Sequence, residues 1–405
     1  MRLDSRSYSP AVLEMIVEAA ARLHSCEHAA FALGLAGIEI SARHVSRIVA
    51  EVGTEMARRR DEKVVRRRRR ELPVRVATLP ELVAVEIDGG RLRTREPGCG
   101  PGVHGKQNKE DKIACLVSLK GETHEHDPRP EPPESFLEPR RVHRLVQAMK
   151  GQAGDKPQDE LPKEDAHTPE EAPKDPKVAS GAPAPVVRTA VASMACSDDF
   201  GPMVAAEAQE RGFYKARSKA FVADGAAYNW SIHRGYFPDF EPITDLLHVL
   251  CYVYLAAWAV GGDDAARWST YVGWLTACWQ GRVKEVIAAL REWQGKLGEP
   301  PEGEGLDRKD PRRLVAEALS YLGNNEARMD YPRYRKGGLP TTSSLAESLV
   351  GQFNARVKGP DKYWNQPEGA EAILQLRAAV LSEDGRLKRF FEERPGCPYR
   401  RRKVA

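Results

Sequence analysis

The chain has 405 residues, a formal net charge of +4 and 41% hydrophobic residues. This length allows two or three domains with sizeable cores, and the composition is typical of a soluble globular protein. Seven scattered cysteines without a C-x-x-C pair argue against a disulfide framework or a zinc ribbon, and a reducing cytoplasm is expected. The N-terminus, MRLDSRSYSP, lacks the apolar core of a signal peptide.

Basic and acidic residues are unevenly distributed. Residues 58–70 contain nine Arg or Lys against two acids, and the chain ends in YRRRKVA. Residues 151–180 show the opposite bias, with eight acids against four lysines. Local basic clusters on a nearly neutral chain predict a polyanionic partner.

The first 56 residues predict three helices. PAVLEMIVEAAARL, SCEHAAFALGLAG and SARHVSRIVAEVG follow one another in the order of a helix-turn-helix unit, with the third helix opened by Ser41. Arg43 and Arg47 then lie near the start of the recognition helix. In the adjoining run, Arg66, Arg67 and Arg68 are candidate phosphate contacts. A three-helix unit without a DNA function, followed by a solvated linker helix, is the alternative.

A catalytic domain is predicted from about Leu79. VAVEID, RLRTRE and KIACLVSLKG predict three strands of a meander, with Gly89 and Gly90 in the first tight turn and a glycine-rich loop before the third strand. Residues 151–185 have no aromatic residue and predict a disordered, acidic, proline-rich insertion. After it, VVRTAVASMA and FGPMVAAEAQERG predict helices and KAFVADG predicts a strand.

The next section is predicted to be a helical subdomain. It holds five of the seven tryptophans, a density typical of a helical core. Its first stretch, VLCYVYLAAWAV (249–260), has twelve residues. A membrane-spanning helix needs about 20, so this stretch predicts a buried helix and no membrane span.

Two aspartates occupy matching positions at predicted strand ends. Asp88 follows VAVEI and Asp224 follows KAFVA, and each is followed by glycine. On neighbouring strands their carboxylates would face each other, and a divalent cation would compensate the like charges. Oxygen ligands of this kind favour Mg²⁺ or Mn²⁺. The alternative is two Asp-Gly hairpin turns.

Glu347 is the candidate third ligand. In TTSSLAESLVGQFNARVKG, Leu345, Leu349 and Phe353 form an apolar stripe, and Glu347 falls on another face in the first turn of the helix. Ser344-Leu-Ala-Glu347 also fits a capping box, in which the glutamate only reaches back to the helix start. The spacing does not separate the two interpretations.

At these residues the chain resembles bacterial insertion-sequence DDE transposases of the Kra type. The resemblance is carried by YLGNNEARMDYPRYRKGGLPTTSSLAESLVGQFNARVKG, by the two Asp-Gly sites, by the Trp that follows in DGAAYNW, by D-x-x-H and by EAILQLRAAVLS. It extends over about residues 9–395, with the acidic insertion as an interruption. It implies an α/β fold, namely an RNase H-like catalytic domain with a large all-helical insertion, preceded by an α-helical helix-turn-helix domain.

The resemblance also implies the domain boundaries. The expected parts are a helix-turn-helix region with a basic linker (1–75), a catalytic domain in three parts (79–150, 186–248 and 339–395), the acidic insertion (151–185), a helical subdomain (249–338) and a basic tail (396–405).

The resemblance assigns roles to residues as well. Asp88, Asp224 and Glu347 would be the catalytic acids and would hold two Mg²⁺ or Mn²⁺ ions per site. The D-x-x-H pair, Asp245 and His248, would stand near them; a helix N-cap with a neighbouring histidine is the alternative. The expected further residues near the site or on DNA are Arg328, Asn354, Arg356 and Lys358.

The expected activity is cleavage and transfer of DNA strands. The partners would be double-stranded DNA, both the terminal inverted repeats of an element and its target, and further copies of the chain. The protein would be cytoplasmic and associated with the nucleoid. Three alternatives remain: an RNase H-like nuclease without strand transfer, a decayed or domesticated copy that only binds DNA, and a two-carboxylate glycosidase, which would leave the arginine runs unexplained.

Overall fold

The computed structural model of the chain describes most of its length. The described residues are 8–94, 107–150, 182–300, 307, 309–359, 362, 364 and 367–394. Three predicted segments lie outside them: most of the glycine-rich loop, residues 151–181 of the predicted insertion, and the basic tail.

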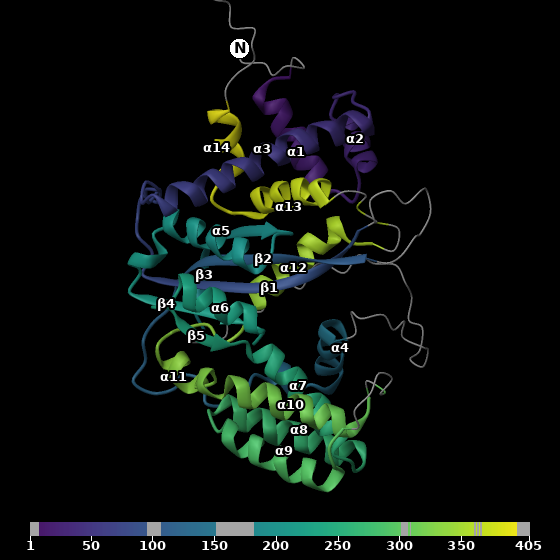
Figure 1. The fold of residues 1–405 in the computed structure, drawn as a ribbon, viewed down its shortest axis with the longest axis vertical. Coiled ribbons are helices and arrows are strands. Elements are labelled where there is room, and N and C mark those ends of the chain that lie inside the picture. The colour runs from purple at the N-terminus through teal and green to yellow at the C-terminus, as the bar shows by residue number, and fades with distance from the viewer. Residues whose placement is uncertain are drawn as a thin grey trace, which may run out of the picture.

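The fold is mixed α/β, built around one five-stranded sheet (Figure 1). The strand order is β3-β2-β1-β4-β5. β2 pairs antiparallel with both β1 and β3, whereas β4 pairs parallel with β1 and β5 pairs parallel with β4. The strands are β1 (Leu82–Thr94), β2 (Gln107–Lys120), β3 (Ala184–Ser193), β4 (Ser218–Ala223) and β5 (Glu241–Thr244).

The predicted turn at Gly89 and Gly90 is wrong. β1 runs without a break from Leu82 to Thr94 and pairs with β2 over its whole length. The stretch RLRTRE therefore continues β1, and β2 begins at Gln107, inside the stretch predicted as the glycine-rich loop. Continuous pairing satisfies the backbone groups of both strands, and this outweighs the local turn preference of two glycines.

The predicted helix over VVRTAVASMA is also wrong. These residues form most of β3, an edge strand that pairs with β2. A short run rich in valine and alanine does not distinguish a strand from a buried helix by its periodicity. The next helix, α5 (Ser197–Glu210), and the strand β4 lie where the sequence predicts them.

Helices cover both faces of the sheet. One face packs against α5 and α6 (Ala227–Tyr236) through Val83, Val85 and Ile87 of β1. The other face packs against α4 (Pro139–Lys150) and α7 (Leu246–Ala259). Helix α12 (Ser344–Val357) crosses this second face behind the sheet in Figure 1. Side chains at even positions of β1, including Ala84, point to the α7 and α12 face.

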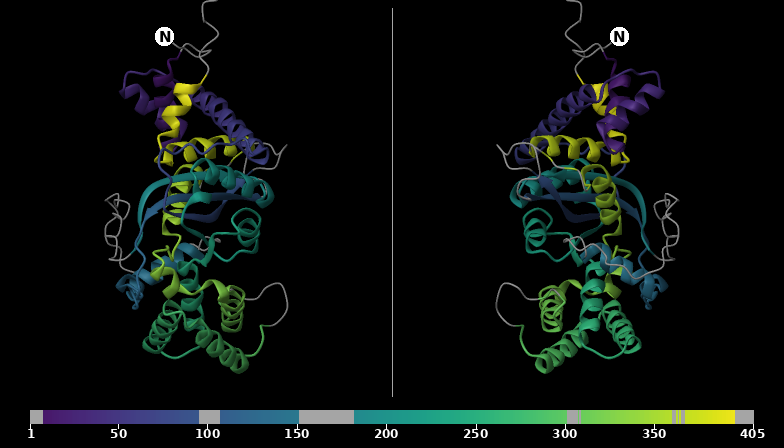
Figure 2. Two further views of the ribbon diagram at one scale, coloured as in Figure 1. Left: turned by 90° about the vertical axis from the view of Figure 1, so that its left-hand side faces the viewer. Right: turned by 90° about the vertical axis from the view of Figure 1, so that its right-hand side faces the viewer.

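The three N-terminal helices share a core with the C-terminal helices. Buried residues of the first group pack in one cluster with those of the second, and the N-terminal helices lie with the last two C-terminal helices at one end of the molecule in the side views of Figure 2. The helices are α1 (Pro10–Arg22), α2 (Cys26–Leu35), α3 (Ala42–Arg68), α12, α13 (Pro367–Leu381) and α14 (Arg386–Glu393). α3 is longer than predicted, because the helix continues through most of the arginine-rich run.

The Trp-rich section forms the opposite end of the molecule, as the green helices of Figure 2 show. Its helices are α7, α8 (Asp264–Trp279), α9 (Val283–Leu297), α10 (Pro311–Asn325) and α11 (Tyr331–Lys336). Trp279 is fully buried, and α7 contributes most of its length to the core, so the predictions of a helical core and of a buried helix over 249–260 are confirmed. None of the described helices has the length and apolar character that a membrane span requires.

Short 3-10 helices complete the described elements. They lie at Glu134–Phe136, Phe213–Lys215 and Glu326–Arg328.

Candidate active site

Asp88 and Asp224 lie side by side on neighbouring parallel strands. Ile87 of β1 pairs with Ala223, the last residue of β4; Asp88 is the next residue of β1, and Asp224 directly follows β4. Alternation along the strands points both side chains to the face covered by α7 and α12. Neither aspartate lies in a hairpin: β1 continues through Asp88, and β4 leads into α6. The hairpin alternative is therefore excluded for both.

The turn after Asp224 is braced from two sides. Asp224 Oδ1 accepts hydrogen bonds from the backbone N–H of Ala226 (2.9 Å) and from Asn229 Nδ2 (2.8 Å), and these bonds start α6. From the helical end of the molecule, Tyr321 of α10 donates its hydroxyl to the Asp224 carbonyl (2.9 Å). Gly225 has φ +94°, and a Cβ there would stand 2.8 Å from Tyr321, so only glycine fits this turn.

Glu347 reaches the same place from helix α12. Its Oε1 is buried and has no hydrogen-bond partner among the described residues. Burial raises the pKa of this carboxyl to about 8, and the nearby carboxylates of Asp245 and Asp88 add to the shift. The N-cap of α12 is Ser343, so the capping box from Ser344 is not formed, and Glu347 points towards the other acids.

Asp245 and His248 belong to this cluster too. Asp245 is fully buried and forms the N-cap of α7, with its Oδ1 accepting from the N–H of Leu247 (3.0 Å). Its Oδ2 pairs with His248 Nδ1 at 2.9 Å. Burial alone would lower the pKa of His248, but the bond to Asp245 and the charges of Asp224 and Asp88 outweigh it and raise the pKa to about 9. Asp245 is therefore the N-cap of α7, and the Asp245–His248 pair also lies beside the other acids.

A group of three residues in this cluster could hold a metal ion. Asp245, His248 and Glu347 each offer one ligand atom, and these atoms lie within 4.8 Å of one another. Asp88 adjoins the group: burial raises its pKa to about 6, His248 lowers it, and Asp224 and Asp245 raise it. The structure thus brings the three predicted acids and the D-x-x-H pair into one electrostatically coupled cluster.

Two further acids lie at the site and were not predicted from the sequence. Glu86 is 1% exposed and lies two residues before Asp88, on the same face of β1. Burial raises its pKa to about 8. Asp111 was assigned to the glycine-rich loop, but it lies on β2 opposite Gly90 and is fully buried. The two-residue spacing of Glu86 and Asp88 in a strand was the signal that could have found the first acid.

Lys358 lies at the end of α12, beside Asp111 and Asp88. Burial lowers the pKa of Lys358, whereas Asp111 and Asp88 raise it. A Cβ on Gly90 would stand 2.7 Å from Lys358 Nζ and 2.8 Å from Asp111 Oδ1, so glycine leaves the space in which these groups approach. Both carboxylate oxygens of Asp111 are buried without a hydrogen-bond partner in the described chain. Asn354, one turn before Lys358, is half-buried.

The structure contradicts the predicted phosphate contact of Arg356. This side chain is 7% exposed, and its Nε donates to the carbonyl oxygen of Ala20 at 2.9 Å. It therefore joins α12 to α1. Arg328 stacks over the Trp230 ring at 4.4 Å and donates to the carbonyl of Asn324. It thus braces the region behind Asp224 and does not point into the acid cluster.

The predicted DNA-binding arginines of α3 differ in their surroundings. Arg43 and Arg47 at its start and Arg68 at its end are exposed. Arg66 donates to the carbonyl of Glu71 (3.2 Å), and Arg67 donates to the Tyr214 hydroxyl (3.3 Å) and lies over its ring. The exposed arginines are free to face a ligand in solution, whereas Arg67 is held against α3's neighbours.

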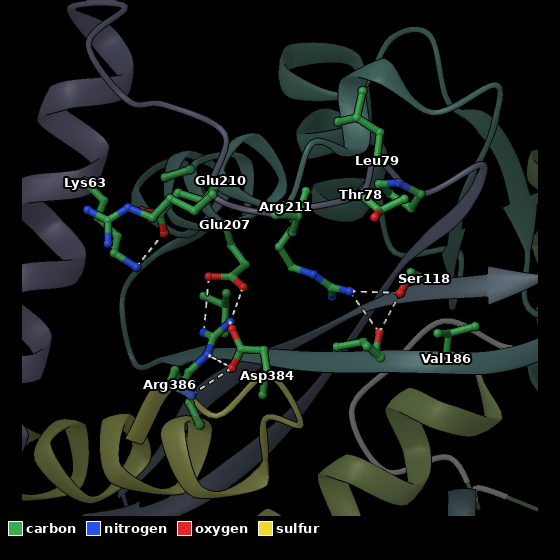
Figure 3. Close-up of a pocket in the computed structure, with 18 of the residues that line it drawn as sticks. Lys63, Thr78, Leu79, Ser118, Val186, Glu207, Glu210, Arg211, Asp384 and Arg386 are labelled. Carbon is green, nitrogen blue, oxygen red and sulfur yellow. Dashed lines mark hydrogen bonds and ion pairs between the residues drawn. The ribbon is translucent and has the colours of Figure 1, made fainter. Parts of the chain in front are cut away.

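A separate cavity of about 1440 Å³ lies at the other end of the strands (Figure 3). The start of β1 and the end of β2 line it, so it does not adjoin Asp88, although Arg66 lines its rim. Several of its charged groups are engaged within the protein: Arg386 pairs with Glu207 and Asp384, and Arg211 donates to the Ser118 hydroxyl and to the Val187 carbonyl. These pairs join the sheet to α5 and α14.

The pKa shifts predict how the stability of the metal-free protein depends on pH. Glu86 and Glu347 have ordinary values near 4.5 and folded values of about 8. Between these pH values the unfolded chain releases the protons more readily, so the free energy of unfolding falls as the pH rises. His248 stabilises the fold fully below about 6.5, and this contribution is lost as the pH rises through about 9. All three groups act in the same direction.

We therefore expect a divalent cation to stabilise the protein more at high pH than at low pH. Mn²⁺ in excess should raise Tm more at about pH 8.5 than at about pH 6.5, because protons compete with the cation for the acids. Thermal denaturation with Mn²⁺ and with EDTA at both pH values measures this. Glu347→Gln should shrink the Mn²⁺-dependent rise. An equal rise at both pH values, or in both proteins, would contradict the site.

No protein-family model matches the chain, and no curated protein matches it.

Proposed function

We propose that the chain is a DDE transposase, an enzyme that cuts DNA strands at the ends of an insertion sequence and joins them to new DNA. The observation that carries this proposal is the convergence of Asp88, Asp224 and Glu347. They are widely separated in the sequence, yet parallel pairing puts the first two side by side, and Glu347 interacts electrostatically with Asp88 from helix α12. The sequence resemblance assigns the same three residues.

The arrangement of the elements supports the same proposal. A mixed five-stranded sheet is compatible with an RNase H-like catalytic domain. The helices α7–α11 lie between the second aspartate and the glutamate, where the family has its helical insertion. The three N-terminal helices with exposed Arg43 and Arg47 fit a helix-turn-helix unit.

The residues of the site fit a divalent cation. Glu347 Oε1 is buried without a partner among the described residues, and several carboxyl groups crowd together beside the cations His248 and Lys358. Mg²⁺ or Mn²⁺, two per site, would supply the Lewis acid that activates a water or a DNA 3′-hydroxyl and neutralises the leaving oxygen. Asp88, Asp224 and Glu347 would hold the ions.

The side chains around the acids have their own parts in this proposal. His248 carries positive charge beside the acids while no cation is bound, which keeps them together in the free protein. Lys358, which feels the charge of Asp88, would contact a DNA phosphate. Arg43, Arg47, Arg66 and Arg68 would contact the phosphates of the terminal inverted repeats, and copies of the chain would pair two such ends.

The test is a DNA cleavage and joining assay. A labelled duplex that carries the DNA on either side of the coding region is mixed with the purified protein, supercoiled plasmid and Mg²⁺ or Mn²⁺. A transposase should nick the duplex at one position and also join its 3′ end to plasmid DNA, because both steps use the same acids and differ only in the nucleophile. Denaturing gels resolve both products.

The two rival functions give different products in this assay. An RNase H-like nuclease would nick DNA without forming a joined product. A decayed copy would bind the duplex and leave it intact with both ions. Either result would overturn the proposed strand transfer.

A further inference from the structure

Helix α12, which carries Glu347, begins without a side-chain cap of its own. Its N-cap residue, Ser343, makes no capping hydrogen bond through its side chain. The first N–H groups of a helix have no partner within the helix and must find one elsewhere. Here the N–H of Ala346 donates to Glu86 Oε2 of β1 at 2.9 Å. A buried carboxyl from the central strand therefore takes the place of the missing cap.

A second buried acid holds the residue before the helix. Asp245 Oδ1 accepts from the N–H of Ser343 (3.1 Å), and its Oδ2 accepts from the Ser343 hydroxyl (2.6 Å). Asp245 is itself fixed at the start of α7 by the N–H of Leu247. Two acids on two rigid elements, the strand β1 and the helix α7, thus hold the first turn of α12 from both sides.

The bonding of Asp245 separates its role from that of Glu347. Each Asp245 oxygen has two partners: Leu247 and Ser343 N–H at Oδ1, and the Ser343 hydroxyl and His248 at Oδ2. A carboxylate has about four acceptor sites, and all four are used here, so a cation held by Asp245 with His248 and Glu347 would have to displace one of these bonds. Glu347 Oε1, by contrast, is buried and has no partner in the described chain.

We propose that Glu86 and Asp245 are positioning residues, which clamp the first turn of α12 and thereby hold Glu347 against Asp88 and Asp224. Glu347 directly follows Ala346, so a shift of this turn moves the Glu347 carboxyl away from the two aspartates. The inference rests on the proposed function only for what Glu347 does there. The clamp itself is a property of the free protein.

The test combines hydrogen exchange with Mn²⁺ binding, both measured without DNA. Glu86→Ala removes the acceptor, whereas Glu86→Gln keeps an oxygen that can accept from Ala346. In Glu86→Ala we expect exchange of the peptide 344–348 to speed up about tenfold or more, because a buried hydrogen bond is lost and the Ala346 N–H is left without its acceptor, and Mn²⁺ binding followed by electron paramagnetic resonance to weaken by a similar factor. Glu86→Gln should keep exchange within about twofold of wild type.

Two further variants keep the test informative if Glu86→Ala unfolds. Ser343→Ala removes the hydroxyl bond to Asp245 without touching a buried acid, and it should speed exchange of the same peptide about threefold or more. Glu81→Ala, an exposed acid just before β1, should change nothing. The clamp is overturned if Glu86→Ala and Ser343→Ala leave peptide 344–348 as protected as in wild type. It is also overturned if Glu86→Gln behaves as Glu86→Ala.

The clamp and the proposed function can be contradicted independently of each other. Faster exchange with weaker Mn²⁺ binding in Glu86→Ala supports the clamp even if the wild-type protein joins no DNA, in which case only the proposed function fails. Wild-type strand joining with unchanged exchange in Glu86→Ala overturns the clamp and leaves the proposed function standing.

Discussion

Replacing Glu347 by glutamine should abolish DNA cleavage and leave DNA binding intact. Glutamine keeps the size and the helix position but removes the charge that a cation needs. The loss of one ligand at a metal-dependent site raises the barrier by several kcal/mol, so nicking of supercoiled plasmid should slow by about 10³-fold or more. Because Glu347 Oε1 has no partner among the described residues, the amide breaks no hydrogen bond there, and Tm without metal should not fall.

The control for this variant is Glu285→Gln. Glu285 also lies in the first turn of a helix, α9, but it is exposed and pairs with Arg282 on the surface. It should nick plasmid at the wild-type rate. Equal nicking by wild type and Glu347→Gln would show that Glu347 is not a ligand, and the assignment of the third acid would be wrong.

The sequence predicts that Asp88 and Asp224 lie together, because their positions depend on simple geometry. Asp88 and Asp224 each follow an apolar run, and parallel pairing of such runs brings the following residues together. The same alternation places Glu86 on the face of Asp88, so this acid was within reach of the same argument. The hydrogen bond between Glu86 and Ala346 could not be predicted in this way, because it joins residues 260 positions apart.

The predictions of secondary structure fail where long-range contacts outweigh a local conformational preference. Gly89 and Gly90 are typical of a turn, yet β1 continues through them. Gly90 is needed because it has no side chain: a Cβ there would occupy the position where Lys358 and Asp111 approach. VVRTAVASMA gives no clear periodicity, and only its pairing with β2 makes it a strand.

Helix periodicity likewise does not show what a helix face meets. Asn354, Arg356 and Lys358 lie close together near the end of α12 and were predicted alike. Arg356 is buried against the Ala20 carbonyl, 336 positions away, whereas Lys358 adjoins the acids. The N-terminal unit shows the same limit: its three helices were predicted, but their shared core with α12–α14 was not.

The central claim is that Asp88 holds a divalent cation that DNA cleavage requires, and a thiol substitution tests it directly. Asp88→Cys replaces an oxygen ligand by sulfur, which binds Mg²⁺ poorly and softer ions such as Mn²⁺ better. The Asp88 side chain bonds only the N–H of Gly89 among the described residues, so the exchange disturbs little else. Asp88→Ser has a similar shape without the sulfur and is the matched control.

The measurement is the plasmid nicking rate of wild type, Asp88→Cys and Asp88→Ser with Mg²⁺ and with Mn²⁺. The account predicts that both variants lose about 10³-fold or more with Mg²⁺, and that Asp88→Cys alone regains about tenfold or more with Mn²⁺. Wild-type nicking by Asp88→Cys with Mg²⁺, or the same rate for both variants with Mn²⁺, would contradict it.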